Sequence, residues 1–203
     1  MAKKRLKSPR ARLFVALTLP SEVREGLAAW QRVALSDERA LRPSRPETLH
    51  MTLAFLGYHP ERDIERIADA ATGFEATAPL VRLAAETVPV PKSRPRLFAI
   101  GAESPQAVAL QAQVESRLVS GGFYKPEKRP FWPHLTVARM RPERRGSKRP
   151  ARIARTPDPL PEALLEPFHG VRITLYRSHL RPAGAENIPM ANLELPSGGS
   201  GKA

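Results

Sequence analysis

The sequence predicts an α+β fold built from two copies of one β-α-β-α-β unit. The first observation is a repeat of ten residues around a histidine, Thr48-Leu49-His50-Met51-Thr52-Leu53-Ala54-Phe55-Leu56-Gly57, which is echoed by Trp132-Pro133-His134-Leu135-Thr136-Val137-Ala138-Arg139. The two histidines lie 84 residues apart, and the same offset aligns two further pairs without a gap: Arg12-Leu13-Phe14 with Arg96-Leu97-Phe98, and Arg45-Pro46 with Arg129-Pro130. A match of this extent indicates a duplicated unit.

The second observation is that both halves show the same order of strand and helix patterns. The first half predicts strands at 13–19, 49–56 and 80–88 and helices at 21–35 and 60–76, with Ser21 as the cap of the first helix. The second half predicts strands at 96–101, around His134 and at 171–180, and helices at 105–119 and near 161–165. We therefore expect two lobes whose antiparallel sheets face each other across a central groove, with the helices outside.

The domain organisation follows from the repeat and the length. The chain has 203 residues, of which 41% are hydrophobic, so it can bury one sizeable core. We expect a single bilobal domain over 12–195, with repeat one at 12–88, repeat two at 96–180 and an extra strand at 187–195. The Pro-, Lys- and Arg-rich segment 89–95 separates the repeats. A basic tail at 1–11 is expected to be flexible, and the Gly- and Ser-rich tail at 196–203 to be disordered.

Charge and composition narrow the function classes. The formal net charge is +13, from 33 Lys+Arg against 20 Asp+Glu, which attracts polyanions but supports a nucleic-acid partner only weakly by itself. Cysteine is absent, so disulfides, thiolate metal sites and thiol nucleophiles are excluded. The apolar segment 13–17 follows a basic run, but no small-residue cleavage site comes before Pro20, and we expect no signal peptide. No apolar run reaches the length of a membrane span, and we expect a cytoplasmic protein.

The first histidine strand carries a polar and an apolar face. Alternate side chains of a strand share a face, so His50 and Thr52 are expected to point one way and Met51, Leu53 and Phe55 the other. The apolar face should pack under the helices. The polar face should present an imidazole and a hydroxyl to the groove.

The second strand repeats this pattern, with His134 and Thr136 on one face and Leu135 and Val137 on the other. Two imidazoles can divide proton transfer, one as a base toward water and the other as an acid toward a leaving oxygen. Threonine hydroxyls can donate to phosphoryl oxygens. A single histidine in a strand is usually an ordinary half-buried residue, but two in equivalent places favour a catalytic site.

The two motifs resemble the paired His-x-Thr-x signature of the 2H phosphoesterases. Their flanks are similar to the bacterial and archaeal RNA 2′,3′-cyclic phosphodiesterase branch, also called the 2′-5′ RNA ligase family. The segments that carry this likeness are Arg12-Leu13-Phe14-Val15-Ala16-Leu17, Phe55-Leu56-Gly57, Pro133-His134-Leu135-Thr136, Arg139 and Leu175-Tyr176-Arg177-Ser178. The resemblance covers about residues 12–195.

The resemblance implies hydrolysis of RNA 2′,3′-cyclic phosphate ends, or of cyclic nucleotides, to 2′-phosphomonoesters without a metal or cofactor. It implies that His50 is the proton donor to the leaving 3′ oxygen and that His134 is the proton acceptor acting on water. Thr52 and Thr136 would hold the phosphoryl oxygens. The substrate contacts that it suggests are Arg139, Phe14, Trp132 and Tyr176. We expect the protein to be a monomer.

Two alternatives stay open at this point. One is the reverse reaction, which joins a cyclic phosphate end to a 5′-hydroxyl through a 2′-5′ linkage, and the other is a non-catalytic RNA- or nucleotide-binding module of the same fold. The basic loops 89–96, 125–129 and 139–155 either follow an RNA backbone or are solvated loops. Of the neighbours Phe131 and Trp132, at most one is expected to reach the groove. The remaining histidines are expected to be loop or surface residues: His59, His169 and His179.

Overall fold

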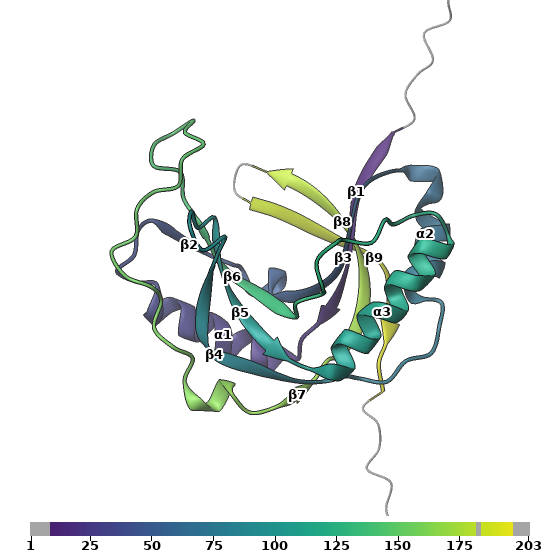
Figure 1. Cartoon of the computed structure of the whole chain (residues 1–203), viewed down its shortest axis with the longest axis horizontal. Helices are drawn as coiled ribbons and strands as arrows, with labels where there is room; N and C mark the ends of the chain where they lie inside the picture. Colours follow the sequence, from purple (N-terminus) through teal and green to yellow (C-terminus); the bar gives the residue numbers. More distant parts are fainter. Residues whose placement is uncertain (1–8, 182–183, 197–203) are drawn as a thin grey trace, which may run out of the picture.

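The computed structural model describes residues 9–181 and 184–196 (Figure 1). Residues 1–8 and 197–203, which hold most of the two predicted tails, lie outside the described residues. Arg10 and Ala11 were expected to belong to the first tail, but they lie in the first strand, and Ala11 is buried. The strand extends this far because Arg10 pairs with Pro60 at the far end of its neighbour.

The described residues form nine strands: β1 (Arg10–Thr18), β2 (Leu41–Pro43), β3 (His50–Pro60), β4 (Leu80–Val90), β5 (Leu97–Glu103), β6 (His134–Met140), β7 (Phe168–His169), β8 (Arg172–Arg181) and β9 (Gly184–Glu194). They also form three α-helices, α1 (Ser21–Ala34), α2 (Ile64–Thr72) and α3 (Pro105–Ser120), and three 3₁₀ turns, η1 (Pro46–Thr48), η2 (Glu61–Asp63) and η3 (Glu162–Leu164). The predicted α+β class is confirmed.

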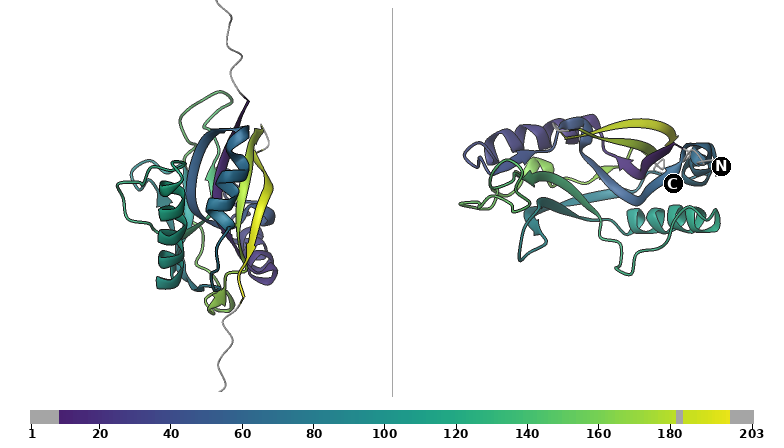
Figure 2. Two further views of the ribbon diagram at one scale, coloured as in Figure 1. Left: turned by 90° about the vertical axis from the view of Figure 1, so that its right-hand side faces the viewer. Right: turned by 90° about the horizontal axis from the view of Figure 1, so that it is seen from above.

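The strands form one strongly curved antiparallel sheet in the order β7-β4-β5-β6-β3-β1-β8-β9, with β2 beside β6 (Figure 2). The two halves of this sheet are joined where β3 meets β6, at the single pair Met51 and Leu135. The facing sheets expected from the repeat are therefore continuous at the two histidine strands. The helices lie outside the curved sheet.

The sequence repeats and the spatial halves do not coincide. The last strand of each repeat joins the other repeat, because β4 pairs with β5 and β8 pairs with β1. The connection between β4 and β5 is short, and Arg96 donates its backbone N–H to the carbonyl of Val90 across it. A connection of this length favours an antiparallel hairpin, so the segment that separates the repeats in sequence ties them together in space.

Three helix predictions need correction. Ser21 does not cap α1: the cap position is Pro20, no side chain caps the helix, and the Ser21 hydroxyl lies 3.4 Å from Glu22. The helix expected at 60–76 is shorter, because Pro60 still belongs to β3 and pairs with β1, and α2 runs only from Ile64 to Thr72. The short helix expected near 161–165 is a single 3₁₀ turn.

The core lies between the convex side of the sheet and the helices. The apolar faces of the two histidine strands belong to it, as predicted, since Met51, Leu53, Leu135 and Val137 are buried. The side chain of Gln31 on α1 donates a hydrogen bond of 2.5 Å to a β6 carbonyl in this layer. Among the described residues, no helix is long and apolar enough to cross a membrane.

Candidate active site

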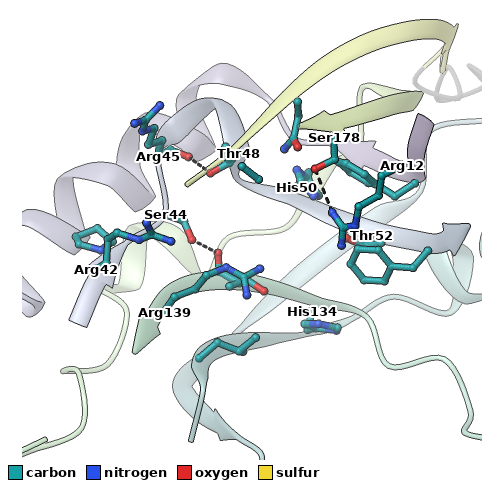
Figure 3. Close-up of a pocket in the computed structure, with 17 residues that line it drawn as sticks. Arg12, Arg42, Ser44, Arg45, Thr48, His50, Thr52, His134, Arg139 and Ser178 are labelled. Carbon is teal, nitrogen blue, oxygen red and sulfur yellow. Dashed lines mark hydrogen bonds between the residues drawn. The ribbon is translucent and has the colours of Figure 1, made fainter. Parts of the chain in front are cut away.

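A cavity of about 500 Å³ opens in the groove where the two halves of the sheet meet (Figure 3). Side chains of β3 and β6 line it, and His50, Thr52, His134 and Thr136 all contribute. The structure therefore brings together the four residues of the two motifs. The other lining residues are Arg12, Phe14, Arg42, Pro43, Ser44, Arg45, Thr48, Phe55, Leu97, Arg139, Ser178, Ala185 and Asn187.

Phe55 was expected on the apolar face, but it lines the cavity and is 54% exposed. The reason is a β-bulge in β3: Val15 pairs with Ala54 while Ala16 pairs with Thr52, so Leu53 is skipped. One extra residue reverses the alternation beyond it. A second skip follows at Leu56, beside Gly57, whose φ of +74° is easily adopted only by glycine.

The imidazole of His50 lies in a stack of aromatic rings. Its centroid is 5.0 Å from the ring of Phe14 and 5.9 Å from the ring of Tyr176, and these two rings stack on each other. Burial, and then the positive charge of Arg139, lower the pKa of His50 from 6.5 to about 4. The His50 imidazole is therefore neutral at pH 7 in the free protein.

The imidazole of His134 is held by its own strand and by one ring. The indole of Trp132 stacks on it with centroids 4.4 Å apart, and Nδ1 lies 2.7 Å from the Trp132 carbonyl oxygen. Because a carbonyl only accepts, Nδ1 carries the hydrogen, and the lone pair of a neutral His134 is on Nε2. This tautomer is the one that a base acting through Nε2 requires.

Four arginines, Arg12, Arg42, Arg45 and Arg139, give the cavity a positive charge, and no carboxylate of the described residues lines it. Arg12 donates to the Ser178 hydroxyl at 3.1 Å. Arg42 and Arg139 are directly paired across β2 and β6. Burial lowers the pKa of Arg139, followed by the charges of Arg42 and Arg12. Like charges in such positions repel, so an anion in the cavity would relieve their repulsion.

Several donors in the cavity are unused. Within the described part of the chain, the hydroxyls of Thr52 and Thr136 and the guanidinium of Arg139 form no hydrogen bond. Asn187 also lines the cavity, and its Oδ1 is buried without a partner among the described residues. The two hydroxyls and the guanidinium can donate to an oxyanion, whereas Asn187 Oδ1 can accept from a donor group of a substrate.

Of the predicted substrate contacts, Arg139 and Phe14 line the cavity, whereas Trp132 and Tyr176 do not line it and stack on the histidines. Phe131 packs against the core instead. The sequence reasoning did not select Arg42, Arg45 or Asn187 as site residues. The repeat also gave no indication that Arg12 belongs to the site. Arg12 and Arg96 are equivalent in the repeat, yet only Arg12 lines the cavity.

His59 and His169 form contacts within the fold and do not line the cavity. His59 lies 3.0 Å from the Leu56 carbonyl and against the edge of Phe123, and His169 lies 3.2 Å from the Ala78 carbonyl. In the described residues, no group of three histidine, aspartate or glutamate side chains has the arrangement of a metal site.

Two histidine–threonine strands that face one basic cavity, on a curved two-part sheet, define a phosphoesterase of the two-histidine class. Comparison with known proteins agrees. Residues 17–98 match the family described as LigT like Phosphoesterase. The chain is 30% identical over 180 residues to a protein of Methanothermobacter thermautotrophicus, covering 86% of this chain and 94% of that one. It is 33% identical over 185 residues to a protein of Thermus thermophilus, covering 85% and 84%. Both relatives are named RNA 2′,3′-cyclic phosphodiesterase.

Solved structures show the same fold. A crystal structure of a Thermus thermophilus protein has a TM-score of 0.73 and 28% identity, covering 92% of this chain and 98% of that one. Escherichia coli LigT complexed with 3′-AMP has a TM-score of 0.71 and 25% identity, covering 92% and 99%. The chain belongs to the LigT-like phosphoesterase family of the 2H superfamily. The family resemblance predicted from the two motifs is confirmed.

Proposed function

We propose that this protein hydrolyses the 2′,3′-cyclic phosphate end of RNA to a 2′-phosphomonoester. The observation that carries the proposal is that two histidine–threonine pairs from neighbouring strands face one cavity rich in arginine. The names of the relatives support the same activity, and the complex of Escherichia coli LigT with 3′-AMP shows a nucleotide bound to a protein of this fold.

The cyclic phosphate binds between the two strands. Its non-bridging oxygens accept hydrogen bonds from the hydroxyls of Thr52 and Thr136 and from the guanidinium of Arg139. These donors have no other partner in the described chain and are fixed by strands. Donors fixed in advance toward oxygens on which charge develops stabilise a transition state at little reorganisation cost.

Proton transfer is divided between the two imidazoles. Nε2 of His134 takes a proton from water as the water oxygen attacks phosphorus, because Nδ1 is held as a donor by the Trp132 carbonyl. His50 gives its proton to the 3′ oxygen as the bond from phosphorus to that oxygen breaks, which leaves a 3′-hydroxyl and a 2′-phosphate. No metal takes part in these steps, because the two imidazoles carry both protons.

The low pKa of His50 makes its protonation depend on substrate. In the free protein, burial and Arg139 disfavour the imidazolium. A bound phosphate anion offsets the charge of Arg139 and favours the imidazolium. His50 therefore acquires its proton when the anionic substrate binds. The cytoplasmic location and the monomeric state that the sequence suggests stay predictions.

The test is turnover of a short RNA that ends in a 2′,3′-cyclic phosphate, with EDTA present, and with the product identified by phosphorus NMR. We expect a 2′-phosphate from the wild type and a loss of about 10²-fold or more in kcat for His50→Ala and for His134→Ala. His59→Ala is the matched control, since His59 lies outside the cavity.

Three results would contradict the proposal. Loss of turnover in EDTA that added metal restores would show metal catalysis. A joined 2′-5′ product as the main outcome, with a 5′-hydroxyl strand present, would favour ligation. RNA binding without turnover by the wild type would favour a binding module.

A further inference from the structure

The loop after β6 is a basic hairpin that the proposed reaction does not use. We call residues 141–152 the Arg-rich hairpin. A bridge pairs Pro142 with Pro150, the backbone N–H of Glu143 donates to the Arg149 carbonyl at 2.9 Å, and that of Ala151 donates to the Arg141 carbonyl at 2.9 Å. It contains six basic residues and one acidic residue: Arg141, Arg144, Arg145, Lys148, Arg149 and Arg152, with Glu143.

The base of the hairpin is attached to the segment 40–45, which includes β2 and supplies two cavity arginines. The backbone N–H of Arg141 donates to the Ala40 carbonyl at 2.7 Å, and its Nε donates to the Leu41 carbonyl at 3.3 Å. Arg42 and Arg45 follow directly in the chain and line the cavity. Figure 3 shows both on the side of the cavity away from His134, and Figure 1 shows the hairpin standing beside β2.

The charges at the tip of the hairpin are exposed and unpaired. Across the described ranges, Arg144, Arg145, Lys148 and Arg149 form no ion pair with a carboxylate. All four are exposed. The positive charge thus continues from Arg45 through the paired Arg42 and Arg139 to the hairpin, which is more cationic surface than one cyclic phosphate requires.

We propose that the RNA strand upstream of the cyclic phosphate leaves the cavity past Arg42 and Arg45 and lies along the Arg-rich hairpin, which binds its phosphodiester backbone. This inference rests on the proposed function, since it takes RNA as the substrate. The hairpin contacts phosphates through flexible cationic side chains, so it raises affinity for a polynucleotide without reading its bases. The enzyme therefore prefers an oligonucleotide end to a cyclic mononucleotide.

On the alternative path, the RNA leaves the cavity in the opposite direction, toward the basic loop 125–129. The loop 125–129 precedes β6, whereas the Arg-rich hairpin follows it, so the two basic segments lie at opposite ends of this strand, about 20 Å apart along it. A direction for the RNA can therefore be tested with two variants that remove equal charge. The hairpin variant is Arg145→Gln, Lys148→Gln and Arg149→Gln. The control variant is Lys125→Gln, Lys128→Gln and Arg129→Gln, and all six side chains are exposed.

The experiment measures turnover of a cyclic mononucleotide and of a short RNA with a cyclic phosphate end, together with fluorescence anisotropy of labelled RNA over a range of salt. For the hairpin variant we expect unchanged kinetics on the mononucleotide and a KM about tenfold higher on the RNA. The slope of log affinity against log salt concentration should fall by about 2, since each phosphate contact on a single strand contributes about 0.7. The control variant should behave as the wild type does.

The inference would be overturned if the hairpin variant bound RNA with the affinity and salt slope of the wild type. It would also be overturned if the control variant lost as much RNA affinity as the hairpin variant. A wild type that turns over neither substrate would refute the proposed function. The anisotropy comparison would still decide the path of the RNA in that case, because it requires no turnover. Thermal melting of both variants confirms that each is folded.

Discussion

His50 and His134 occupy equivalent places in the repeat, yet their imidazoles have different neighbours. His50 lies against Phe14, and burial, followed by the charge of Arg139, lowers its pKa and keeps it neutral, whereas His134 is oriented by the Trp132 carbonyl at 2.7 Å. The asymmetry supports different roles for the two residues in proton transfer. It comes from side chains outside the motifs, so the motifs alone cannot assign the acid and the base.

The neutral state of His50 predicts a pH dependence of stability. The pKa is about 4 in the folded protein and about 6.5 in an unfolded chain. Above pH 6.5 the imidazole is neutral in both states. Between pH 6.5 and 4 only the unfolded chain binds the proton. The free energy of unfolding therefore decreases as the pH is lowered through this range, and this residue contributes up to roughly 3 kcal/mol to the decrease.

The check is urea denaturation of the wild type and His50→Asn at pH 7 and pH 4.5. The wild type should lose more stability on acidification than the variant, because only the wild type carries this group. Equal losses would show that His50 titrates alike in both states. His59→Asn serves as the comparison for a histidine outside the cavity.

At the scale of elements, the C-terminal end of the short helix α2 is capped by a side chain of the neighbouring helix α3. α2 ends at Thr72, and the guanidinium of Arg117 on α3 donates to the carbonyls of Ala70 at 2.9 Å and Gly73 at 3.0 Å. It also lies 5.1 Å from the ring centre of Phe74. These carbonyls have no partner within a helix that ends there, so one side chain of α3 satisfies the end of α2.

Replacing this cap should affect stability and leave catalysis intact. We expect Arg117→Ala to lower the free energy of unfolding by about 1–2 kcal/mol, because the hydrogen bonds from a charged donor to the carbonyls of Asp69, Ala70 and Gly73 are lost. The kcat/KM should stay at the wild-type value, since Arg117 does not line the cavity. Arg66→Ala is the matched control, because its guanidinium only lies over the ring of Phe123, and it should cost about 0.5 kcal/mol. An Arg117 variant as stable as this control would contradict the cap.

At the scale of the whole molecule, the exchange of β4 and β8 makes the repeats interdependent. Repeat one alone would lack β8, which pairs with β1. Repeat two alone would lack β4, which pairs with β5. An edge that is normally paired would then be exposed. Neither repeat alone has a complete sheet, and we therefore propose that the two repeats fold as one cooperative domain.

This arrangement predicts fragment complementation. Residues 1–92 and 93–203, each produced alone, should show no cooperative thermal transition. Mixed together, the two fragments should recover strand circular dichroism and a cooperative transition. A cooperative transition in either fragment alone would show that the repeats fold as independent units.

The sequence determined the α+β class and the four motif residues, and it determined the order of elements apart from β2, β7 and the 3₁₀ turns. These features depend on local periodicity and on the duplication, which are properties of the chain alone. His50, Thr52, His134 and Thr136 could be placed on one face each because alternation along a strand is local. Phe55 shows the limit of such reasoning, since a bulge set by the pairing with β1 turned it toward the cavity.

Only the tertiary structure decided which segments meet. β4 and β8 join the opposite repeat, Arg42 is placed opposite Arg139, and the aromatic rings of Phe14 and Tyr176 enclose His50. Each of these contacts joins residues far apart in the chain, and its energy comes from burial and charge, which depend on the complete fold. The residue types of the site could therefore be predicted from the sequence, while its charge and its asymmetry came from the packing of the sheet.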